Sequence, residues 1–193
     1  MKGQAKIIVL ALLGIIVLGG LGIAAYGVSS YNRMVRLHEQ IPGAWSQVEN
    51  VLQRRNDLIP NLVNTVKGFA KQEQAIYGQI SAALAAFNRA TTTSEKIAAD
   101  NTLSGFLRGL TAVSLQYPQL QSSERFQRLM DELAGTENRI AVERMRYNET
   151  VLAYNTLVKT FPTSLIAKIG GLSPAEDYFK AEAAAQVAPK VEF

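Results

Sequence analysis

Residues 45–69 read WSQVENVLQRRNDLIPNLVNTVKGF, and their pattern decides the fold. Apolar residues return at alternating steps of three and four, which places them on one face of an α-helix. The series continues with the same spacing as far as Phe87: Trp45, Val48, Leu52, Ile59, Leu62, Val66, Phe69, Ile76, Ile80, Ala83 and Phe87. About six heptads of this kind predict one long helix with coiled-coil-like packing.

Two prolines bear on this helix. Pro60 lies inside the pattern, where it removes one backbone hydrogen bond, so a kink is predicted there. Pro42 and Gly43 come just before the pattern. They predict a break between the long helix and a membrane-proximal helix.

A second helix follows the loop at residues 89–94. Ser94 is the candidate N-cap, and the helix should run to about Leu115. Gly105 and Gly109 are expected to interrupt it.

A third long helix begins near Ser122 or Ser123 and ends before Thr160-Phe161-Pro162. It repeats the heptad at Phe126, Leu129, Leu133, Ile140, Tyr147, Val151, Tyr154 and Val158. A short helix over about 174–186 is also predicted, with Pro174 in its first turn. Since strand-like alternation is missing, the fold class is all-α: an N-terminal transmembrane helix followed by an antiparallel bundle of three long helices plus a short C-terminal helix.

Four charged residues occupy positions where the heptad pattern requires an apolar side chain: Arg55, Glu73, Glu137 and Arg144. A charge buried alone is costly, which predicts cross-helix pairs such as Arg55 with Glu137. The alternative is that the bundle flares and water solvates these side chains.

The N-terminus carries an uncharged stretch over residues 7–28, IIVLALLGIIVLGGLGIAAYGV. As a helix it would rise about 33 Å, enough for a hydrocarbon core of about 30 Å. It is longer than the apolar region of a cleaved signal peptide, which is the alternative. We therefore predict a membrane anchor over residues 1–30 and a helical body over 31–193, with the short helix and tail at 163–193.

The charges that flank the anchor give only a weak indication of its orientation. The basic residues that flank the span are nearly balanced: Lys2, Lys6, Arg33 and Arg36. The short N-terminal tail slightly favours a cytoplasmic N-terminus. This predicts a single-pass protein of the bacterial inner membrane with a periplasmic or extracytoplasmic body. Gly20 and Ala24 form a small-xxx-small pair, which favours a homo-oligomer.

Composition excludes several classes of function. The chain of 193 residues has no cysteine, a single histidine, His38, and a net charge of +4. A thiol nucleophile, a disulfide and a cysteine zinc site are therefore excluded. His38-Glu39 cannot continue into a zincin motif because Pro42 occupies the second ligand position. We predict no enzyme, no catalytic residue, no cofactor or metal, and no nucleic-acid partner.

The block at residues 50–69 contains a candidate interaction surface. Arg54, Asp57 and Asn61 lie beside the predicted kink at Pro60, where a freed carbonyl can serve a partner. The alternative is that Arg54 and Asp57 pair with each other while the apolar neighbours form core.

The dipeptide Tyr-Asn occurs at Tyr31-Asn32, Tyr147-Asn148 and Tyr154-Asn155. The last two are one heptad apart and share a face. One interpretation is that these tyrosines pack with their hydroxyls at the edge of the core. The other is that Asn148 and Asn155 form a polar ladder that fixes the register between helices.

Several blocks together resemble the LemA family of bacterial proteins. They are residues 50–69, YPQL at 117–120, TENRIAVERMRYNETVLAYN at 136–155 (which includes Asn138), Tyr178-Phe179 and the closing Val191-Glu192-Phe193. The resemblance implies a single-pass anchor and a helical bundle, and it brings no reaction. Some members are described with a cytoplasmic body. Family genes often lie near genes for membrane metalloproteases or envelope proteins.

These observations predict a non-enzymatic, membrane-anchored scaffold or adaptor of the bacterial envelope. Its partners would be the lipid bilayer, further copies of itself and an envelope protein. The alternative is an accessory or sensor stalk for a membrane enzyme such as an envelope metalloprotease.

Overall fold

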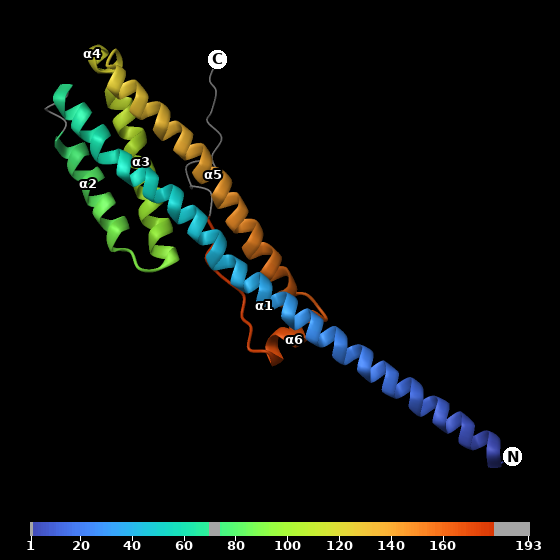
Figure 1. The fold of residues 1–193 in the computed structure, drawn as a ribbon. Helices are drawn as coiled ribbons and strands as arrows, with labels where there is room; N and C mark the ends of the chain where they lie inside the picture. The colour runs from blue at the N-terminus through green and yellow to red at the C-terminus, as the bar shows by residue number, and fades with distance from the viewer. Residues whose placement is uncertain (1, 70–73, 180–193) are drawn as a thin grey trace, which may run out of the picture. The chain divides into compact units, whose positions relative to one another are not determined.

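The structure, a computed structural model, describes residues 2–69 and 74–179. Its regular elements are helices: α1 (Lys2–Phe69), α2 (Gln74–Arg89), α3 (Thr93–Ser114), α4 (Pro118–Gln121), α5 (Glu124–Lys159) and α6 (Thr163–Ile169). Figure 1 shows them in chain order. No strand occurs within these residues, so the predicted all-α class is confirmed.

The chain forms two compact units, and α1 and α5 each contribute to both. The smaller unit contains residues up to Pro42 together with 149–176. The larger unit contains residues 43–148 together with the chain from Asp177.

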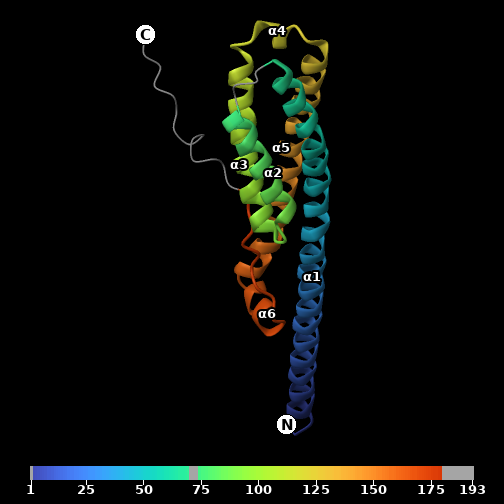
Figure 2. The ribbon, with the colours of Figure 1, turned by 90° about the vertical axis from the view of Figure 1, so that its left-hand side faces the viewer.

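The larger unit contains four long helical segments that alternate in direction: α1 from Gly43, α2, α3 and α5 as far as Asn148 (Figures 1 and 2). The short helix α4 lies between α3 and α5 in the chain. Helices α2 and α3 pack against each other. The buried core contains Ile59, Leu62, Val63, Val66, Tyr77, Ile80, Ala83, Leu103, Leu110, Leu120, Phe126 and Leu133. Most of these are heptad positions predicted on α1, α2 and α5, so the predicted core faces are confirmed at those positions. Phe69, which the series also placed in the core, is 42% exposed.

The long helix predicted from Trp45 to Phe87 is wrong in its continuity. Helix α1 ends at Phe69 and α2 begins at Gln74. The heptad spacing is unbroken between Phe69 and Ile76, so periodicity could not reveal where the chain turns. Glu73, one of the predicted charged core positions, lies outside the described residues.

Proline and glycine do not break the helices where predicted. Helix α1 continues through Pro42-Gly43 and through Pro60, and the side chains of both prolines are exposed. Helix α3 likewise continues through Gly105 and Gly109. A proline or glycine costs a helix local stability, but packed neighbours on the buried face outweigh that cost. The kink at Pro60 stays a prediction.

Helix α3 begins with a capping box whose first residue, Thr92, lies two residues before the predicted cap at Ser94. The Glu95 backbone N–H donates to Thr92 Oγ1 at 3.2 Å, while the backbone N–H groups of Thr91 and Thr92 donate to Glu95 Oε2 at 2.9 and 3.1 Å. These hydrogen bonds to the charged carboxylate lower the pKa of Glu95. The N-cap is therefore Thr92.

The smaller unit packs α5 and α6 against the first part of α1. Its buried core is Met34, Tyr154, Val158 and Ala167. The short helix predicted over 174–186 is wrong over 174–179, which are not helical, and its remainder lies outside the described residues. The short helix forms earlier, as α6, after the predicted end of the third helix.

The start of α1 exposes an apolar surface. Its large apolar side chains between Leu10 and Val28 are 49% to 76% exposed. This helix is long and apolar enough to cross a membrane. So much exposed apolar surface is costly in water, so the segment indicates association with a membrane.

Candidate functional site

Four charged side chains meet inside the larger unit and form what we call the charged cluster: Arg55 from α1, Asp100 from α3, and Glu137 and Arg144 from α5. Arg55 Nη2 donates to Asp100 Oδ1, and Arg144 Nη2 donates to Asp100 Oδ2. Arg55 Nη1 donates to Glu137 Oε1 at 2.9 Å and to Ser104 Oγ at 2.8 Å. The cluster therefore ties three helices together.

Burial decides the electrostatics of the charged cluster. The side chains of Arg55 and Asp100 are completely buried, whereas that of Glu137 is 44% exposed. Burial lowers the pKa of Arg55, and the negative charge of Glu137 opposes that shift. Two positive and two negative charges offset one another, which is what buried charges require. The predicted Arg55–Glu137 pair is confirmed, and the solvated alternative is wrong for Arg55.

Asp100 is the member of the charged cluster that sequence reasoning missed. A usable signal was present, because Asp100 falls on the same helical face as Ile97, Leu103 and Leu110, which are all buried. A carboxylate in that series marks a core position that must be paired.

A cavity of about 310 Å³ reaches the charged cluster from outside. It lies between α1, α3 and α5, and its lining is Leu62, Ser104, Leu107, Arg108, Thr111, Met130, Leu133, Ala134 and Glu137. Glu137 brings the exposed edge of the cluster to this cavity. The lining suits an apolar side chain of a partner that also carries a hydrogen-bond donor for the carboxylate.

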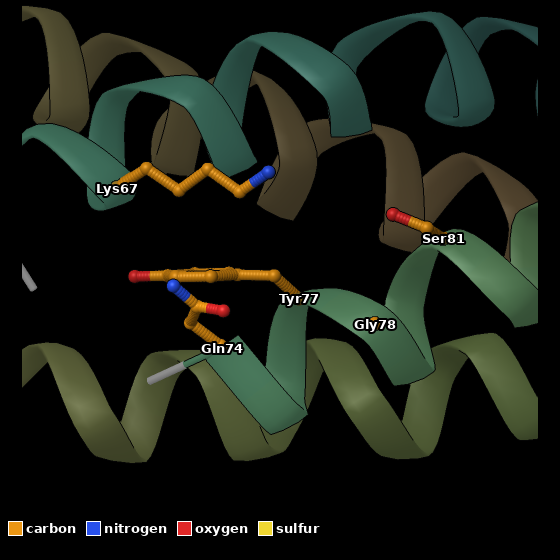
Figure 3. A pocket seen from close by; sticks show the side chains of 5 residues that line it. All are labelled: Lys67, Gln74, Tyr77, Gly78 and Ser81. Atoms are coloured by element: carbon orange, nitrogen blue, oxygen red, sulfur yellow. The ribbon is translucent and has the colours of Figure 1, made fainter. Parts of the chain in front are cut away.

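A second cavity, of about 500 Å³, lies between α1 and α2 (Figure 3). Lys67 Nζ is 5.3 Å from the centroid of the Tyr77 ring, a cation–π contact. Gln74 lies on the opposite side of that ring in Figure 3. Among the described residues that line this cavity, Lys67 is the one with a basic or acidic side chain.

An aromatic cluster holds the backbone that follows residue 176 in the larger unit. The Phe179 ring stacks on Trp45 with ring centroids 5.9 Å apart, and it meets Tyr147 edge-on at 5.7 Å. Arg144 Cζ lies 4.9 Å from the Phe179 ring. Arg144 thus belongs to both the charged cluster and this aromatic cluster.

Asn148 forms hydrogen bonds with both backbone polar groups of Phe179. Its Nδ2 donates to the Phe179 carbonyl at 2.9 Å, and its Oδ1 accepts from the Phe179 N–H at 3.0 Å. We call this arrangement an asparagine clamp. Beside it, burial is the main cause that raises the pKa of Tyr147 to about 12, followed by the charges of Asp177 and Tyr178.

The smaller unit contains a second asparagine clamp. Asn155 Nδ2 donates to the Ala175 carbonyl at 2.8 Å, and the Ala175 N–H donates to Asn155 Oδ1 at 2.8 Å. The Tyr154 hydroxyl donates to the Ser173 carbonyl at 2.8 Å. The interpretation of Tyr147 and Tyr154 as packed tyrosines is confirmed, since both are buried.

The ladder predicted between helices is wrong in its target. The clamp bonds of Asn148 and Asn155 go to backbone groups of a non-helical segment, at Phe179 and Ala175. The predicted C-terminal helix is missing at the same place. A helix would use those N–H and C=O groups itself and could not offer them to asparagine.

The remaining predicted site residues lie on the surface, away from the charged cluster. They are Arg54, Asp57, Pro60 and Asn61 on α1 and Asn138 on α5, and all are exposed. Asp57 accepts a hydrogen bond from Gln53 Nε2 at 3.0 Å rather than from Arg54. The apolar neighbours Ile59, Leu62 and Val63 are core residues, as the alternative interpretation of this block predicted.

Metal-binding groups do not converge in the part of the chain that the structure describes. No group of three or more His, Cys, Asp or Glu side chains could hold an ion there. The ring centroid of His38 lies 5.2 Å from that of Tyr154 in the smaller unit, and its side chain is about half exposed.

Most of the chain is similar to known proteins. A sequence model of the LemA family matches residues 44–193. Two MamQ magnetosome proteins of Paramagnetospirillum magneticum are each 29% identical over 196 residues, which covers 88% of this chain and 72% of theirs. A MamQ magnetosome protein of Magnetospirillum gryphiswaldense is 26% identical over 175 residues, or 77% of this chain and 64% of its own.

Proposed function

Since the chain belongs to the LemA family, we propose that it is a non-enzymatic, membrane-anchored scaffold or adaptor of the bacterial envelope. It acts through protein–protein contacts and through association with further copies of itself. Its MamQ relatives are named as magnetosome proteins.

The charged cluster is the observation that carries the proposal. It brings together four charged groups from three helices, which is the arrangement from which a catalytic site could be built. Here the charged groups form ion pairs with one another, and Asp100 pairs with both Arg55 and Arg144. A self-neutralised cluster of this kind, buried except at Glu137, fixes how the helices pack.

Two surfaces of the larger unit suit protein partners. One is the exposed polar face of α1 formed by Arg54, Asp57 and Asn61. The other is the cavity beside Glu137, which combines apolar walls with a carboxylate. An interface of this mixed kind, with an apolar centre and a polar rim, is typical of partners that bind reversibly.

The anchor is residues 1–30, in the inner membrane, with the body on the periplasmic or extracytoplasmic side. The test uses the natural lack of cysteine in the full chain. A Thr91→Cys variant should react with a membrane-impermeant maleimide once the outer membrane of the cells is permeabilised. If this cysteine reacts only after the inner membrane is opened as well, the body is cytoplasmic and this part of the proposal fails.

Self-association is tested by the mass of the full chain in detergent or nanodiscs, measured by mass photometry after cross-linking. We expect species larger than one copy, and Gly20→Ile should reduce them because close helix packing needs a small residue. Ile23→Leu is the matched control, since it keeps the size of the side chain in the same helix. A single-copy mass under all conditions would remove self-association from the proposal.

A second candidate function is a sensor or accessory stalk for a membrane enzyme. It is favoured by the continuity of α1, which is one helix from Lys2 to Phe69. The two functions differ in what the apolar segment must do. If a foreign transmembrane helix in place of residues 7–28 restores the wild-type phenotype of a deletion strain, the segment serves as an anchor only. Loss of function with correct membrane insertion would favour the stalk.

A further inference from the structure

Helix α6 in the smaller unit has an apolar face that nothing in the described chain covers. Thr163 and Ala167 point into the core, whereas Phe161, Leu165 and Ile169 are 79%, 53% and 89% exposed. Leu165 and Ile169 lie four residues apart and therefore share one side of the short helix, and Phe161 lies in the turn just before it. A cluster of large exposed apolar side chains marks an interaction site.

The same unit places this face at the end of the apolar segment of α1. Gly170, which follows α6, lies so close to the Tyr31 ring that a Cβ would not fit between them. Tyr31 comes three residues after Val28, where the exposed apolar stretch ends. Figures 1 and 2 both show α6 beside this part of α1. Tyrosines in such positions are typical of the boundary between lipid and water.

The charges around α6 fit a surface with negative headgroups. Lys159 and Lys168 flank the apolar residues and are exposed, as is Arg33 on α1. The sequence contains no Asp or Glu between Glu149 and Glu176. Apolar side chains bordered by lysines are the composition of elements that lie in a membrane interface.

We propose that α6, with Phe161, is a second membrane contact that lies in the interface of an anionic bilayer. Phe161, Leu165 and Ile169 enter the boundary between headgroups and acyl chains, and Lys159 and Lys168 contact anionic phosphate groups. This contact rests on the proposed anchor, because it requires the end of the span to lie at the same interface. The protein would then contact the membrane through α6 as well as through the single span.

The test places one cysteine at a time in the full chain and labels it with the fluorophore NBD. The positions are Ile169 on the proposed contact, Thr156 as an exposed control on α5 of the same unit, and Val17 inside the span. The labelled proteins are reconstituted in vesicles of phosphatidylcholine with phosphatidylglycerol, with and without lipids that carry a doxyl quencher. We expect a blue-shifted emission and quenching by doxyl lipid at Ile169 and Val17, and neither at Thr156.

The outcomes separate the two proposals. If the label at Val17 is quenched and the label at Ile169 is not, α6 does not touch the bilayer, although the anchor stands. An unquenched label at Val17 overturns the anchor itself. A blue-shifted but unquenched label at Ile169 means that protein, such as a second copy, covers this face, which also overturns the lipid contact.

The charge requirement is tested separately with the double variant Lys159→Gln/Lys168→Gln, which keeps the apolar face intact. Quenching at Ile169 should be stronger in vesicles with phosphatidylglycerol than in pure phosphatidylcholine, and the double variant should lose this difference. Circular dichroism at 222 nm checks that the helices are retained. If the labelled protein that keeps both lysines is quenched equally in the two lipids, the proposed role of anionic headgroups is overturned.

Discussion

The larger unit contains two polar clusters that connect distant parts of the chain in different ways. In the charged cluster, Asp100 receives hydrogen bonds from two arginines on two other helices. In the asparagine clamp, Asn148 pairs its neutral amide with the backbone of Phe179. The first connects helix to helix through ionised groups, and the second connects a helix to a non-helical segment through neutral groups.

This difference predicts how each cluster fails. A buried ion pair that loses one partner leaves an uncompensated charge, at a cost of about 3–5 kcal/mol. A neutral amide that is removed leaves backbone groups without partners, at a cost of about 1–3 kcal/mol when no water can replace it. The clusters should therefore differ more in their response to single substitutions than in their contribution to the intact fold.

The largest effect is expected for Asp100→Asn, which keeps the shape of the side chain and removes its charge. Arg55 and Arg144 would both lose their shared carboxylate in a buried site, so the free energy of unfolding should fall by about 3–5 kcal/mol. Thermal unfolding of the full chain in mild detergent, followed by circular dichroism at 222 nm, measures this. Asp57→Asn, on the exposed face of α1, should stay within about 0.5 kcal/mol of the wild type.

A combined variant sharpens the same test. In Arg55→Met/Asp100→Leu/Arg144→Met no buried charge is left alone, because Glu137 is partly exposed and can be solvated. We expect this variant to be at least about 2 kcal/mol more stable than Asp100→Asn. If it is the less stable of the two, the charged cluster stabilises the bundle by its ion pairs themselves, and mutual compensation is not the explanation.

The charged cluster was largely predictable because its signal is local. Arg55, Glu137 and Arg144 break an apolar heptad series, and a charge in a core position needs a partner. The partner Asp100 is found only from the buried face of α3, because the signals for the ends of that helix do not point to it. Continuity was predicted less well: Pro42 and Gly43 predicted a break, but packing of the buried face keeps α1 continuous.

The asparagine clamps were predictable only in part. The repeated Tyr-Asn dipeptide pointed to Asn148 and Asn155 on one face of a helix. Their target could not be inferred, because a run such as residues 174–179 has local features of a helix N-terminus. Tertiary contacts decide whether this segment forms a helix. Burial of Phe179 against Trp45 and the clamp bonds outweigh the helix that the local sequence favours.

The next effect in size is expected for Asn155→Ala in the smaller unit. Asn155 is only 3% exposed, so the N–H and C=O of Ala175 would lose partners that water cannot easily replace. The free energy of unfolding should fall by about 2 kcal/mol, measured by thermal unfolding as above. Asn138→Ala on the exposed side of α5 is the matched control, with no change beyond about 0.5 kcal/mol. Equal effects at both positions would show that the clamp does not stabilise the unit.

A smaller effect is expected for Asn148→Ala, because Asn148 is only half-buried and water can reach the backbone that it releases. We expect a loss of about 1 kcal/mol. Trp45 is the only tryptophan and stacks on Phe179, so its fluorescence reports directly on the docking of that ring. Asn148→Ala should shift the emission to the red, whereas Asn138→Ala should not. An unchanged emission in Asn148→Ala would mean that the aromatic contacts hold Phe179 without the clamp.

The smallest effect concerns alkaline pH and the tyrosine beside the same clamp. Burial, and then the charge of Asp177, raise the pKa of Tyr147 to about 12, above its ordinary value of 10.0. Because this pKa is raised in the folded state, the stabilisation that protonated Tyr147 provides is fully present below pH 10. That contribution is lost as the pH rises from 10 to 12, because the unfolded chain releases the proton more readily. Tyr147→Phe cannot ionise, so its stability should fall less steeply over that range, as followed by Trp45 emission. If the two curves are parallel between pH 10 and 12, Tyr147 is not shielded in the folded protein, and the aromatic cluster around Phe179 is more open than the structure indicates.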